Sequence, residues 1–455
     1  MATTYLSRTF TASATGEQQW TLSMWVKRTG ISATQYLFNA YSDTNNYTGL
    51  YFDSTDKLAF ASITGGSDTG NLTTNRLFRD TSGFYNIVAV WDSNNGTPGD
   101  RMKLYVNGVE ETSFATDTNP SSGQDSFVGD SGKNCLLGYK GETGFYFDGL
   151  MTHVQLVDSA ALAPTEFGEV DSSSGIWKIN TSCYATPGEN GFCLKMETTT
   201  GSAMGTDSSG EGNNLAESGS PTQTVDNPSS VMATFNFLDN YYNSSTLSNG
   251  NTTVVTSPSG YTSTKATLGV TKGKWFWETK YVSKTGGYKY PLIGISSTQV
   301  SGTNQELGHF ANDWGYLMDN TTPNYRNNDG STSYGDSYTE GDIVGVGLDL
   351  DNNKLYFAVN GTWVNSGVPT SGATGTGALS ITAPASTPIG AYFPAVGYWD
   401  GTYGGTFETN FGNGKFGTTA ISSAGTSSTD DDSIWEYDCP TGYYGLNTKN
   451  INTYG

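Results

Sequence analysis

The sequence is poor in the residues that mark disulfide scaffolds and membrane proteins. Its 455 residues contain only four cysteines, which is too few for a disulfide framework in a chain of this length. No stretch approaches the roughly 18 consecutive apolar residues of a membrane-spanning helix. We therefore predict a protein that neither relies on a disulfide framework nor inserts into a membrane.

Basic residues are also scarce. Lys and Arg number 22 against 43 Asp and Glu, which gives a net charge of -21. A field of this sign repels phosphate backbones and anionic lipids, so we expect no nucleic-acid partner. The other polar residues are mainly Ser, Thr, Asn and Tyr, and such a surface is suited to sugars or proteins as ligands.

The N-terminal segment MATTYLSRTFTASATGEQQW lacks the basic and then apolar layout of a secretory signal. We therefore do not expect ordinary secretion. Cys183 and Cys193 flank the turn-like segment ATPGEN and could pair across a hairpin, but two free thiols explain them as well. Free thiols are our expectation for a protein made in the cytoplasm. Cys135 and Cys439 have no evident mates.

The common catalytic devices are missing from the sequence. No Glu-x-Asp-x-Glu run is present to place an acid and a nucleophile about 5 Å apart on one strand, as retaining glycosidases require. The nearest acidic cluster, 166–171, contains Gly168 and is expected to be a solvated turn. The two histidines give no zinc spacing: His153 is expected in a strand with a satisfied hydrogen bond, and His309 as a loop contact or structural residue. We predict a protein that is not an enzyme, with no catalytic residues.

Aromatic residues and glycine are abundant instead, with 28 Tyr, 21 Phe, 10 Trp and 58 Gly. They fall in short runs with a period of two, separated by Gly, Asn and Asp, which indicates strands and tight turns. Asn107-Gly108 and Asn360-Gly361 predict two-residue hairpin turns. Pro164 is expected to open a single helical turn that ends at Gly168. The predicted class is all-β, with antiparallel β-sandwich domains in tandem.

One segment, 197–230, is rich in Gly and Ser and nearly free of aromatics. We interpret it as a polar linker between a domain at 1–196 and a second domain at 231–422. The remainder, 423–455, is expected to be a tail with a closing strand followed by an extended end.

The second half resembles a SPRY domain, a bent β-sandwich found in many protein-interaction proteins. Five motifs occur in the order and rough spacing of that family: GKWFWETKYV (273–282), PLIGIS (291–296), GDIVGVGLDLDNNKLYFAVNG (341–361), YFPAVG (392–397) and TFETNFG (406–412). The resemblance implies a β-turn at 349–353 and a ligand face built from loops between strands.

The first half resembles laminin-G and concanavalin-A-like jelly rolls. The runs that carry this resemblance are WTLSMWVKR (20–28), FYNIVAVWD (84–92), MKLYVNGVEE (102–111) and FDGLMTHVQLVDSAAL (147–162). Both domains, the segment between them and the ending YDCPTGYYGLNTKN together resemble tail-fibre and other virion surface proteins of marine tailed bacteriophages. That resemblance implies a virion-surface location after synthesis in the host cytoplasm without a signal peptide. It also implies contacts with other virion proteins and a homo-oligomer, a trimer in most fibres.

Several predicted loops place aromatic residues beside Asn and Asp, the combination that recognises sugar rings and hydroxyl groups. The alternative is that these aromatics close the ends of the sandwiches. The candidate ligand-binding residues are Tyr41, Asn45, Asn46, Tyr47, Trp91, Asp92, His309, Asn312, Asp313, Trp314, Trp399, Asp400 and Tyr403.

No organic cofactor is expected, but calcium is a possible ligand. Jelly rolls of this type often hold the ion with carboxylates from neighbouring loops. The candidates are Asp53, Asp92, Asp100 and Asp148. Aspartates in turns also bond to their own backbone, which is the alternative explanation.

Three functions remain open from the sequence. The first is a phage adhesin that binds a host cell-surface glycan or receptor through the aromatic loops. The second is a structural decoration or fibre protein of the capsid or tail, whose contacts are mainly with other virion proteins. The third is a polysaccharide depolymerase, which lacks the expected carboxylate pair.

Overall fold

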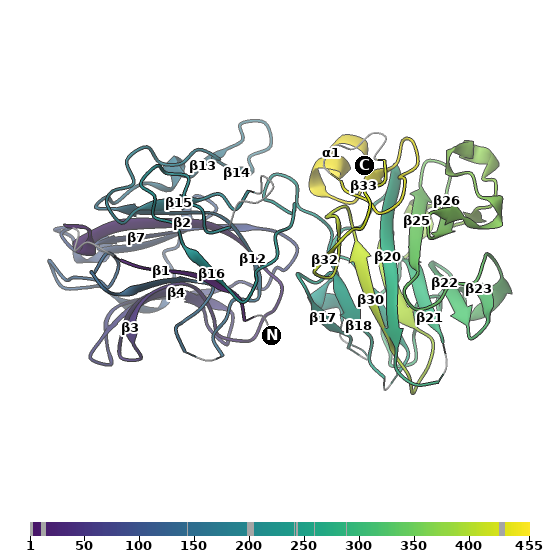
Figure 1. The fold of residues 1–455 in the computed structure, drawn as a ribbon, viewed down its shortest axis with the longest axis horizontal. Coiled ribbons are helices and arrows are strands. Elements are labelled where there is room, and N and C mark those ends of the chain that lie inside the picture. The colour runs from purple at the N-terminus through teal and green to yellow at the C-terminus, as the bar shows by residue number, and fades with distance from the viewer. Residues whose placement is uncertain are drawn as a thin grey trace. The chain divides into compact units, whose positions relative to one another are not determined.

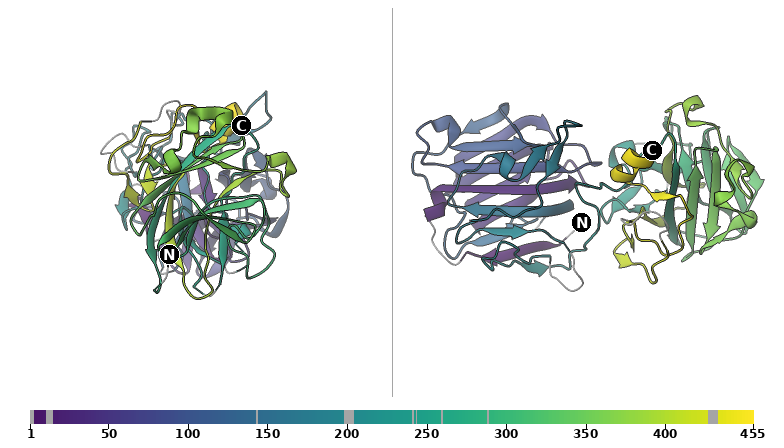
Figure 2. Two further views of the ribbon diagram at one scale, coloured as in Figure 1. Left: turned by 90° about the vertical axis from the view of Figure 1, so that its right-hand side faces the viewer. Right: turned by 90° about the horizontal axis from the view of Figure 1, so that it is seen from above.

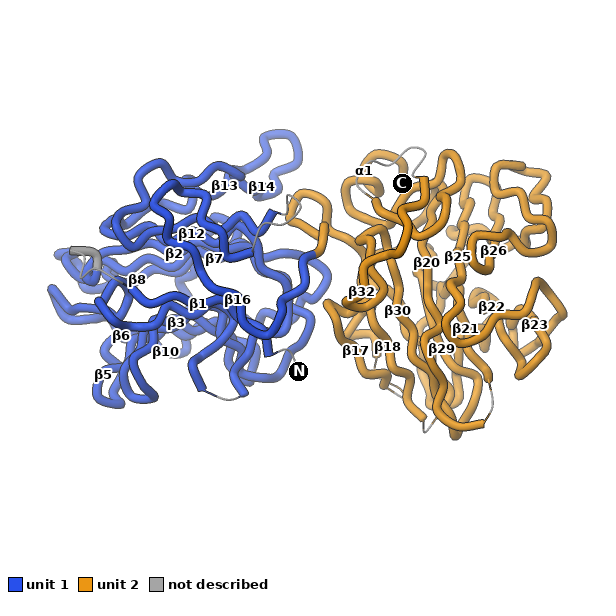
Figure 3. The backbone as a smooth tube through the Cα atoms, viewed as in Figure 1, with its two compact units in different colours: residues 1–223 blue, residues 224–455 orange. Residues whose placement is uncertain are grey.

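The computed structural model describes residues 3–10, 15–142, 144–197, 204–240, 242, 244–258, 260–287, 289–426 and 433–455. The chain divides into two compact units, residues 1–223 (unit 1) and 224–455 (unit 2), shown in Figures 1 and 3. Nearly every regular element in both units is a β-strand, and the strands pair almost entirely in antiparallel fashion. The predicted all-β class is therefore confirmed.

Unit 1 is a sandwich of two facing sheets (Figure 1), and its strands are seen from above in the right view of Figure 2. The eight-stranded sheet contains, in spatial order, β10 (Phe114–Thr118), β6 (Ser67–Leu77), β5 (Lys57–Thr64), β4 (Asn46–Phe52), β3 (Gln35–Asp43), β11 (Asn134–Leu137), β1 (Tyr5–Thr9) and β16 (Ala216–Ser218). The six-stranded sheet contains β15 (Phe192–Leu194), β12 (Gly149–Asp158), β2 (Gln19–Arg28), β7 (Tyr85–Asp92), β8 (Met102–Val106) and β9 (Val109–Glu110). A separate hairpin consists of β13 (Gly168–Val170) and β14 (Trp177–Ile179).

The core of unit 1 lies between these two sheets, and alternation along the strands explains its composition. Every second residue of β2, beginning with Trp20, enters the core because successive side chains of a strand point to opposite faces. The Trp20 ring lies parallel to that of Trp91, with centroids 6.5 Å apart, and edge-on to Phe60 at 5.5 Å. Large aromatic side chains therefore fill the centre of this sandwich.

Unit 2 contains a nine-stranded sheet and a six-stranded sheet around a second core. The larger sheet has the order β17 (Thr246–Ser248), β18 (Thr253–Val255), β30 (Gly405–Asn410), β20 (Lys274–Lys284), β25 (Ile343–Asp349), β26 (Lys354–Val359) and β27 (Thr362–Trp363), with β28 (Leu379–Ser380) on β26 and β33 (Tyr444–Gly445) on β20. The smaller sheet has the order β19 (Thr262–Lys265), β29 (Phe393–Tyr398), β21 (Pro291–Ser296), β22 (Asp313–Asp319), β23 (Thr322–Asn327) and β24 (Gly330–Ser333). β31 (Lys415–Phe416) and β32 (Thr419–Ala420) form a separate pair.

The helical elements of the described residues are short. Seven are 3-10 turns: η1 (Thr15–Gln18), η2 (Pro98–Asp100), η3 (Pro164–Glu166), η4 (Phe237–Asp239), η5 (Val364–Ser366), η6 (Pro369–Thr374) and η7 (Pro384–Ser386). The expected turn at Pro164 is therefore confirmed. In the part of the chain that the structure describes, no helix has the length and apolar character needed to cross a membrane.

Both predicted hairpin turns are present. Asn107 and Gly108 adopt φ values of 51° and 76° between β8 and β9, and Asn360 and Gly361 adopt 45° and 79° between β26 and β27. Two consecutive positive φ angles are what a type I′ turn requires. The turn expected at 349–353 is present too, where Asp349 Oδ1 accepts a hydrogen bond from the backbone N–H of Asn352 at 3.0 Å.

The segment expected to be a polar linker, 197–230, is not free chain where it is described. Residues 198–203 lie outside the described residues, but β16 pairs with β1 and Leu215 is buried in the core of unit 1. Asp207 accepts a hydrogen bond from the backbone N–H of Cys193 at 2.9 Å. The division between the units falls after Gln223, so much of this polar segment completes unit 1.

The C-terminal tail also differs from its prediction. Its closing strand is β33, which runs parallel to β20, but the expected extended end is wrong. The chain ends in α1 (Thr448–Tyr454), where the side chain of Asn447 accepts a hydrogen bond from the backbone N–H of Asn450 at 2.8 Å. This side-chain cap and the packing of Ile451 against the core explain a helix in a sequence of weak helix formers.

The expectation of two free thiols at Cys183 and Cys193 is wrong in this structure. The two residues form a disulfide, with Cα atoms 5.8 Å apart, while Cys135 and Cys439 are buried thiols outside any disulfide. Cys193 lies in β15, and the bond attaches the loop before it to the edge of the six-stranded sheet.

Replacing both Cys183 and Cys193 with Ala should lower the free energy of unfolding of unit 1 by about 2 kcal/mol, because the open loop gains entropy in the unfolded state. Guanidinium unfolding followed by tryptophan fluorescence measures the difference. As a control, a thiol assay of the native chain in denaturant without reductant should count only Cys135 and Cys439. Detection of all four thiols of the chain would contradict the disulfide.

Candidate functional site

The two ligand loops predicted in unit 2 lie on the outer face of its six-stranded sheet. One face of this sheet supplies residues such as Ile293 to the main core of the unit. The opposite face carries a separate apolar cluster that contains Leu292 and Leu307, and Trp399 packs against it. Leu307 belongs to the loop at 297–312 and Trp399 to the loop at 399–404. Since both residues pack in this cluster, the two loops cover the same outer surface of the sheet.

Arg326, on β23, joins these two loops. Its Nε lies 2.5 Å from Glu306 Oε1, and its Nη2 lies 3.1 Å from Asp329 Oδ1. The guanidinium carbon lies 4.4 Å from the centre of the Trp399 ring, in the range of a cation–π contact. One buried side chain therefore holds a loop, a hairpin turn and the predicted aromatic residue together.

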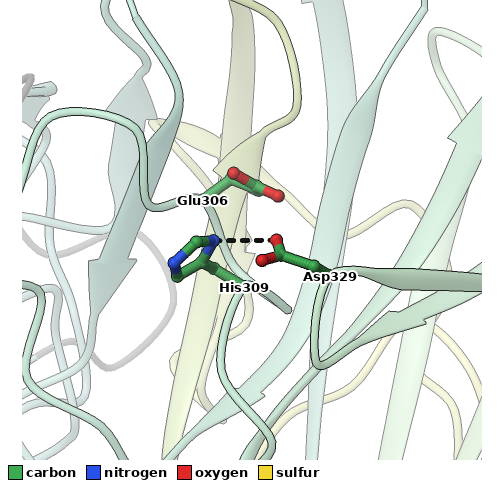
Figure 4. A group of neighbouring side chains, drawn as sticks. All are labelled: Glu306, His309 and Asp329. Carbon is green, nitrogen blue, oxygen red and sulfur yellow. Dashed lines mark hydrogen bonds and ion pairs between the residues drawn. The ribbon is translucent and has the colours of Figure 1, made fainter.

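Glu306, His309 and Asp329 form a compact group beside Arg326 (Figure 4). His309 Nδ1 lies 2.8 Å from Asp329 Oδ1, and one ligand atom from each residue lies within 4.8 Å of the other two. This spacing could hold a metal ion, but the Arg326 guanidinium already lies against both carboxylates. A second cation there would be repelled, so the chemistry of the group is that of an ion-pair network. His309 therefore contacts the neighbouring turn through Asp329, and its role as a ligand residue stays a prediction.

The segment 309–314 is only partly a surface. Asp313 is fully buried, where its Oδ1 accepts a hydrogen bond from the hydroxyl of Ser296 at 2.8 Å. Burial raises the pKa of Asp313 to about 6. The prediction that Asp313 contacts a ligand is therefore wrong, because the segment that contains Ser296 and Ser297 buries its carboxylate and hydrogen-bonds it. Asn312 is half-buried and remains a candidate, whereas Trp314 packs against the main core of the unit, on the face opposite to Trp399.

The loop 399–404 is shaped by its own aspartate. Asp400 Oδ1 accepts hydrogen bonds from the backbone N–H groups of Thr402 at 2.6 Å and Tyr403 at 2.9 Å, which is ordinary turn chemistry. The Tyr403 ring lies over Gly286, where an added Cβ would come within 2.0 Å of it. Trp399 is half-buried and meets Tyr290 edge-on, with centroids 5.6 Å apart.

In unit 1, the predicted loop 41–47 is the tight turn between β3 and β4. Asp43 bonds the side chain of Asn46 at 2.9 Å and the backbone N–H of Asn45 at 2.9 Å, so these polar groups mainly stabilise the turn. Tyr47 is buried, because the segment that contains Lys140 covers it. Tyr41 is half-buried, and its hydroxyl lies 3.5 Å from Glu142 Oε1.

Lys140 occupies an aromatic cage on this face. Its Nζ lies 5.2 Å from the ring centre of Tyr47, 5.1 Å from that of Phe145 and 5.9 Å from that of Tyr36. Glu142 balances the charge at 3.2 Å. The chain therefore fills this cage with its own cation.

Trp91 is not a ligand residue. It is completely buried against Trp20, because the alternation of β7 directs it into the core together with Ile87 and Ala89. The predicted loop position of Trp91 is therefore wrong, because the residue belongs to strand β7. Asp92 follows it at the surface and is half-buried.

The four candidate calcium ligands do not gather into one site. Asp53 accepts from the backbone N–H of Thr55 at 2.7 Å, Asp100 pairs with Lys103 at 3.0 Å, and Asp148 accepts from the Thr29 hydroxyl at 2.9 Å. Among the described residues, the only group with three metal-ligand atoms at suitable spacing is the one around His309. Asp53, Asp100 and Asp148 therefore have local partners. None of the four candidate aspartates belongs to the group around His309.

The residues considered for catalysis have structural surroundings. Glu166 and Glu169 are exposed around the β13 hairpin. His153 is buried at a bulge of β12 with a φ of 47°, and burial lowers its pKa. Its Nδ1 lies 3.0 Å from the Thr152 hydroxyl, but its buried Nε2 has no partner among the described residues, so the expected hydrogen bonding is only half present.

Sequence reasoning missed the two cations that organise these surfaces, Lys140 and Arg326. Arg326 directly precedes the turn Asn-Asn-Asp-Gly at 327–330. The position of Arg326 close to Asp329 in this turn could have predicted an ion pair between them. Its other partners, Glu306 and Trp399, are distant in the sequence and could not be predicted in this way.

Comparison with known families assigns a type to each unit. Residues 2–166 match Laminin_G_3, the concanavalin A-like lectin/glucanases superfamily, and residues 274–412 match the SPRY domain. The chain contains a concanavalin A-like domain and a SPRY domain. Both expectations from the sequence resemblance are confirmed, and this domain content indicates a binding function. No curated protein matches the chain.

Solved structures similar to parts of the chain include a SPRY domain, a pentraxin and a putative carbohydrate binding protein. The SPRY domain of human HERC1 is 18% identical, with a TM-score of 0.28, and the match covers 36% of this chain and 91% of that one. The native heptameric SAP-like pentraxin of Limulus polyphemus is 19% identical, with a TM-score of 0.27 and coverage of 36% and 73%. A putative carbohydrate binding protein from Bacteroides ovatus is 15% identical, with a TM-score of 0.31 and coverage of 48% and 56%.

The ion-pair network predicts a specific pattern of stability changes. Arg326→Met should lower the free energy of unfolding of unit 2 by about 3 kcal/mol, because it leaves Glu306 buried without a counter-charge. The double variant Arg326→Met/Glu306→Leu should recover most of that loss. Denaturant unfolding of the three proteins gives the comparison, with His309→Ala as a control that should stay within about 1 kcal/mol of the native chain. Equal losses in the single and double variants would contradict the network.

Proposed function

We propose that this chain is a non-enzymatic virion surface protein of a tailed bacteriophage, of the tail-fibre type, that binds a host cell-surface glycan or receptor. The phage assignment is supported by the sequence resemblance, which extends over both domains and the C-terminal ending. The binding role is supported by the two domain types. Synthesis in the host cytoplasm, display on the virion, contacts with other virion proteins and assembly as a homo-oligomer, a trimer in most fibres, belong to the same proposal.

The observation that carries the glycan proposal is the contact between Arg326 and Trp399. It brings both predicted loops of unit 2 to one face, where a half-buried indole lies beside charged and amide side chains. Sugars are recognised by aromatic surface against their C–H groups, together with polar groups that fix their hydroxyls. On this face Trp399 provides the aromatic surface, and the polar groups are those of Asp400 and Asn312.

The charges on this face support binding without hydrolysis. A glycosidase needs one carboxyl group to donate a proton and another to act as base or nucleophile. Glu306 and Asp329 both pair with Arg326, which holds the two carboxylates in place. In the first unit, whose family also includes glucanases, the acidic cluster around Gly168 lies on an exposed hairpin.

The disulfide is compatible with this proposal if it forms late. A protein made in a reducing cytoplasm acquires Cys183–Cys193 only after it reaches an oxidising medium. Release of virions by lysis provides that change of medium.

Trp399→Ala should reduce binding of the purified protein to host cells, or to glycan prepared from them, at least about tenfold, since one stacked aromatic contributes on the order of 1.5 kcal/mol. Flow cytometry of labelled protein measures the loss. Tyr454→Ala provides a matched control, because this tyrosine is 41% exposed at the end of α1 and lies outside both loops.

Thermal unfolding of both variants distinguishes lost binding from lost structure. Native binding that Trp399→Ala leaves unchanged would overturn the assignment of this face. Absence of any binding by the native protein would overturn the adhesin proposal itself. Release of reducing sugar from host polysaccharide would support the depolymerase alternative instead.

One observation favours the second candidate, a structural virion protein. Three apolar side chains on unit 1 are largely exposed: Val109 at 69%, Val170 at 61% and Ile176 at 64%. Val170 pairs with Trp177, Ile176 precedes it in the chain, and Val109 follows Gly108, which lies against the Trp177 ring. Apolar side chains grouped at a surface are typical of protein–protein contacts. This patch supports contacts with other virion proteins.

Val170→Thr together with Ile176→Ser should reduce incorporation of the chain into virions and leave binding to cells unchanged, because the changes are confined to the exposed hairpin. Quantitative immunoblotting of purified particles from complemented infections measures incorporation. Val255→Thr, another exposed valine but on unit 2, is the control. Normal incorporation of the double variant would contradict the role of the patch.

A further inference from the structure

Unit 2 contains a small cavity on the outer face of its nine-stranded sheet, away from the loops of the candidate glycan face. Phe276 and Glu278 of β20 line it from the sheet, and Tyr437 and Asp438 line it from the C-terminal segment. Trp363 of β27 forms a further wall. The cavity has room for about one water-sized group.

The cavity exists because three neighbouring residues lack bulky side chains. Gly345 lies opposite Ala358 on the adjacent strand, and a Cβ on Gly345 would lie 3.3 Å from the Phe276 ring. Gly361 has a φ of 79°, and a Cβ there would come within 2.6 Å of the Tyr437 ring. Larger residues at these positions would fill the space or displace its wall.

Glu278 brings a negative charge to this cavity, although it is completely buried. Its Oε1 accepts a hydrogen bond from the backbone N–H of Tyr437 at 2.8 Å, and its Oε2 accepts from that of Glu436 at 2.9 Å and from the Asn410 side chain at 3.0 Å. All three donors are neutral. Among the residues that the structure describes, no lysine or arginine forms an ion pair with Glu278.

Burial of the Glu278 carboxylate without an ion-pair partner favours the binding of a cation in the cavity. Burial raises the pKa of Glu278 to about 7, and the nearby Glu436 adds to the rise. A buried carboxylate is costly unless it is paired, and a positive group in the cavity would supply the missing partner.

The walls are also suited to a cation. Phe276 and Trp363 have ring centres 6.2 Å apart, and Tyr437 lies on the same cavity. Aromatic faces attract cations, most strongly when water is excluded. Asp438 is exposed on the lining and adds a second carboxylate, whereas none of the lining residues that the structure describes is basic. The lining therefore consists of three aromatic residues, two acidic residues and small residues.

We propose that this cavity binds the ammonium group of a lysine side chain from a protein partner. An ammonium group is compact and its four-carbon stem is narrow, which fits a water-sized space between aromatic walls. A planar guanidinium or the ring of an amino sugar is too large for it. This site is separate from the Trp399 face and goes beyond the proposed function, so it stands whether or not that face binds glycan.

Titration of the full chain with Nα-acetyl-lysine methylamide, followed by amide NMR with transverse relaxation optimisation, tests the proposal. The backbone signals of Gly345 and Gly361 should shift in a saturable manner at millimolar ligand. The norleucine analogue, which has a similar stem without the charge, should leave them unchanged. Absence of a shift with the lysine compound, or an equal shift with norleucine, would overturn the proposal. An equal shift with glucosamine would overturn the assignment to lysine.

Three variants locate the effect. Asp438→Asn should weaken binding at least fivefold while it preserves the fold, because the residue is exposed. Ala358→Leu should abolish binding by filling the cavity. Asp319→Asn, a change of the same charge at the turn between β22 and β23, should bind like the native chain. Unchanged binding by the folded Asp438→Asn and Ala358→Leu proteins would contradict the site, and a loss in Asp319→Asn equal to that in Asp438→Asn would show that only net charge matters.

Discussion

Unit 2 is closed by a single buried carboxylate. Glu278 lies in the middle of β20 and accepts hydrogen bonds from two consecutive backbone N–H groups, which lie 158 and 159 residues later in the chain. These bonds hold the C-terminal segment against the outer face of the sheet, where Trp435 packs on Phe276 and is completely buried. Each oxygen of the carboxylate accepts from a different N–H group, whereas a glutamine at this position would offer only one acceptor oxygen. The parallel strand β33 and helix α1 follow from this attachment, and the aromatic cavity lies beside it.

The opposite sheet of unit 2 depends on a charge in a comparable way. Arg326 balances Glu306 and Asp329 and lies over Trp399, so the loops of the outer face have one shared support. Such a network contributes little net stability compared with apolar packing, but removing one member is costly. Together with the apolar cluster around Leu307, it fixes the position of the loops. The surface proposed for glycan binding is therefore held rigid by an interaction that does not itself need to touch the ligand.

The strands and tight turns were predictable because they depend on neighbours in the sequence. Alternation in β2, β20 and β25 identifies their buried faces, and Asn107-Gly108 identifies its hairpin. The errors have a different cause. Trp91 was assigned to a loop because polar residues follow it, yet the phase of alternation in β7 places it inside. The polar strand β16 and the disulfide depend on pairing with distant parts of unit 1, and Arg326 and Glu278 have partners that local patterns do not reveal.

Two basic residues of this chain occupy sites whose chemistry resembles that of the cavity beside Glu278. In unit 1, Lys140 fills a cage of three aromatic rings and is balanced by Glu142. In unit 2, Arg326 lies over an aromatic ring and is balanced by two acids. Both sites combine aromatic surface, an acidic residue and a cation from the chain itself. The cavity beside Glu278 has the aromatic surface and the acid, but the described residues of its lining include no cation. Since aromatic and acidic groups together stabilise a cation more than either does alone, a lysine from another protein completes the same arrangement at this third site.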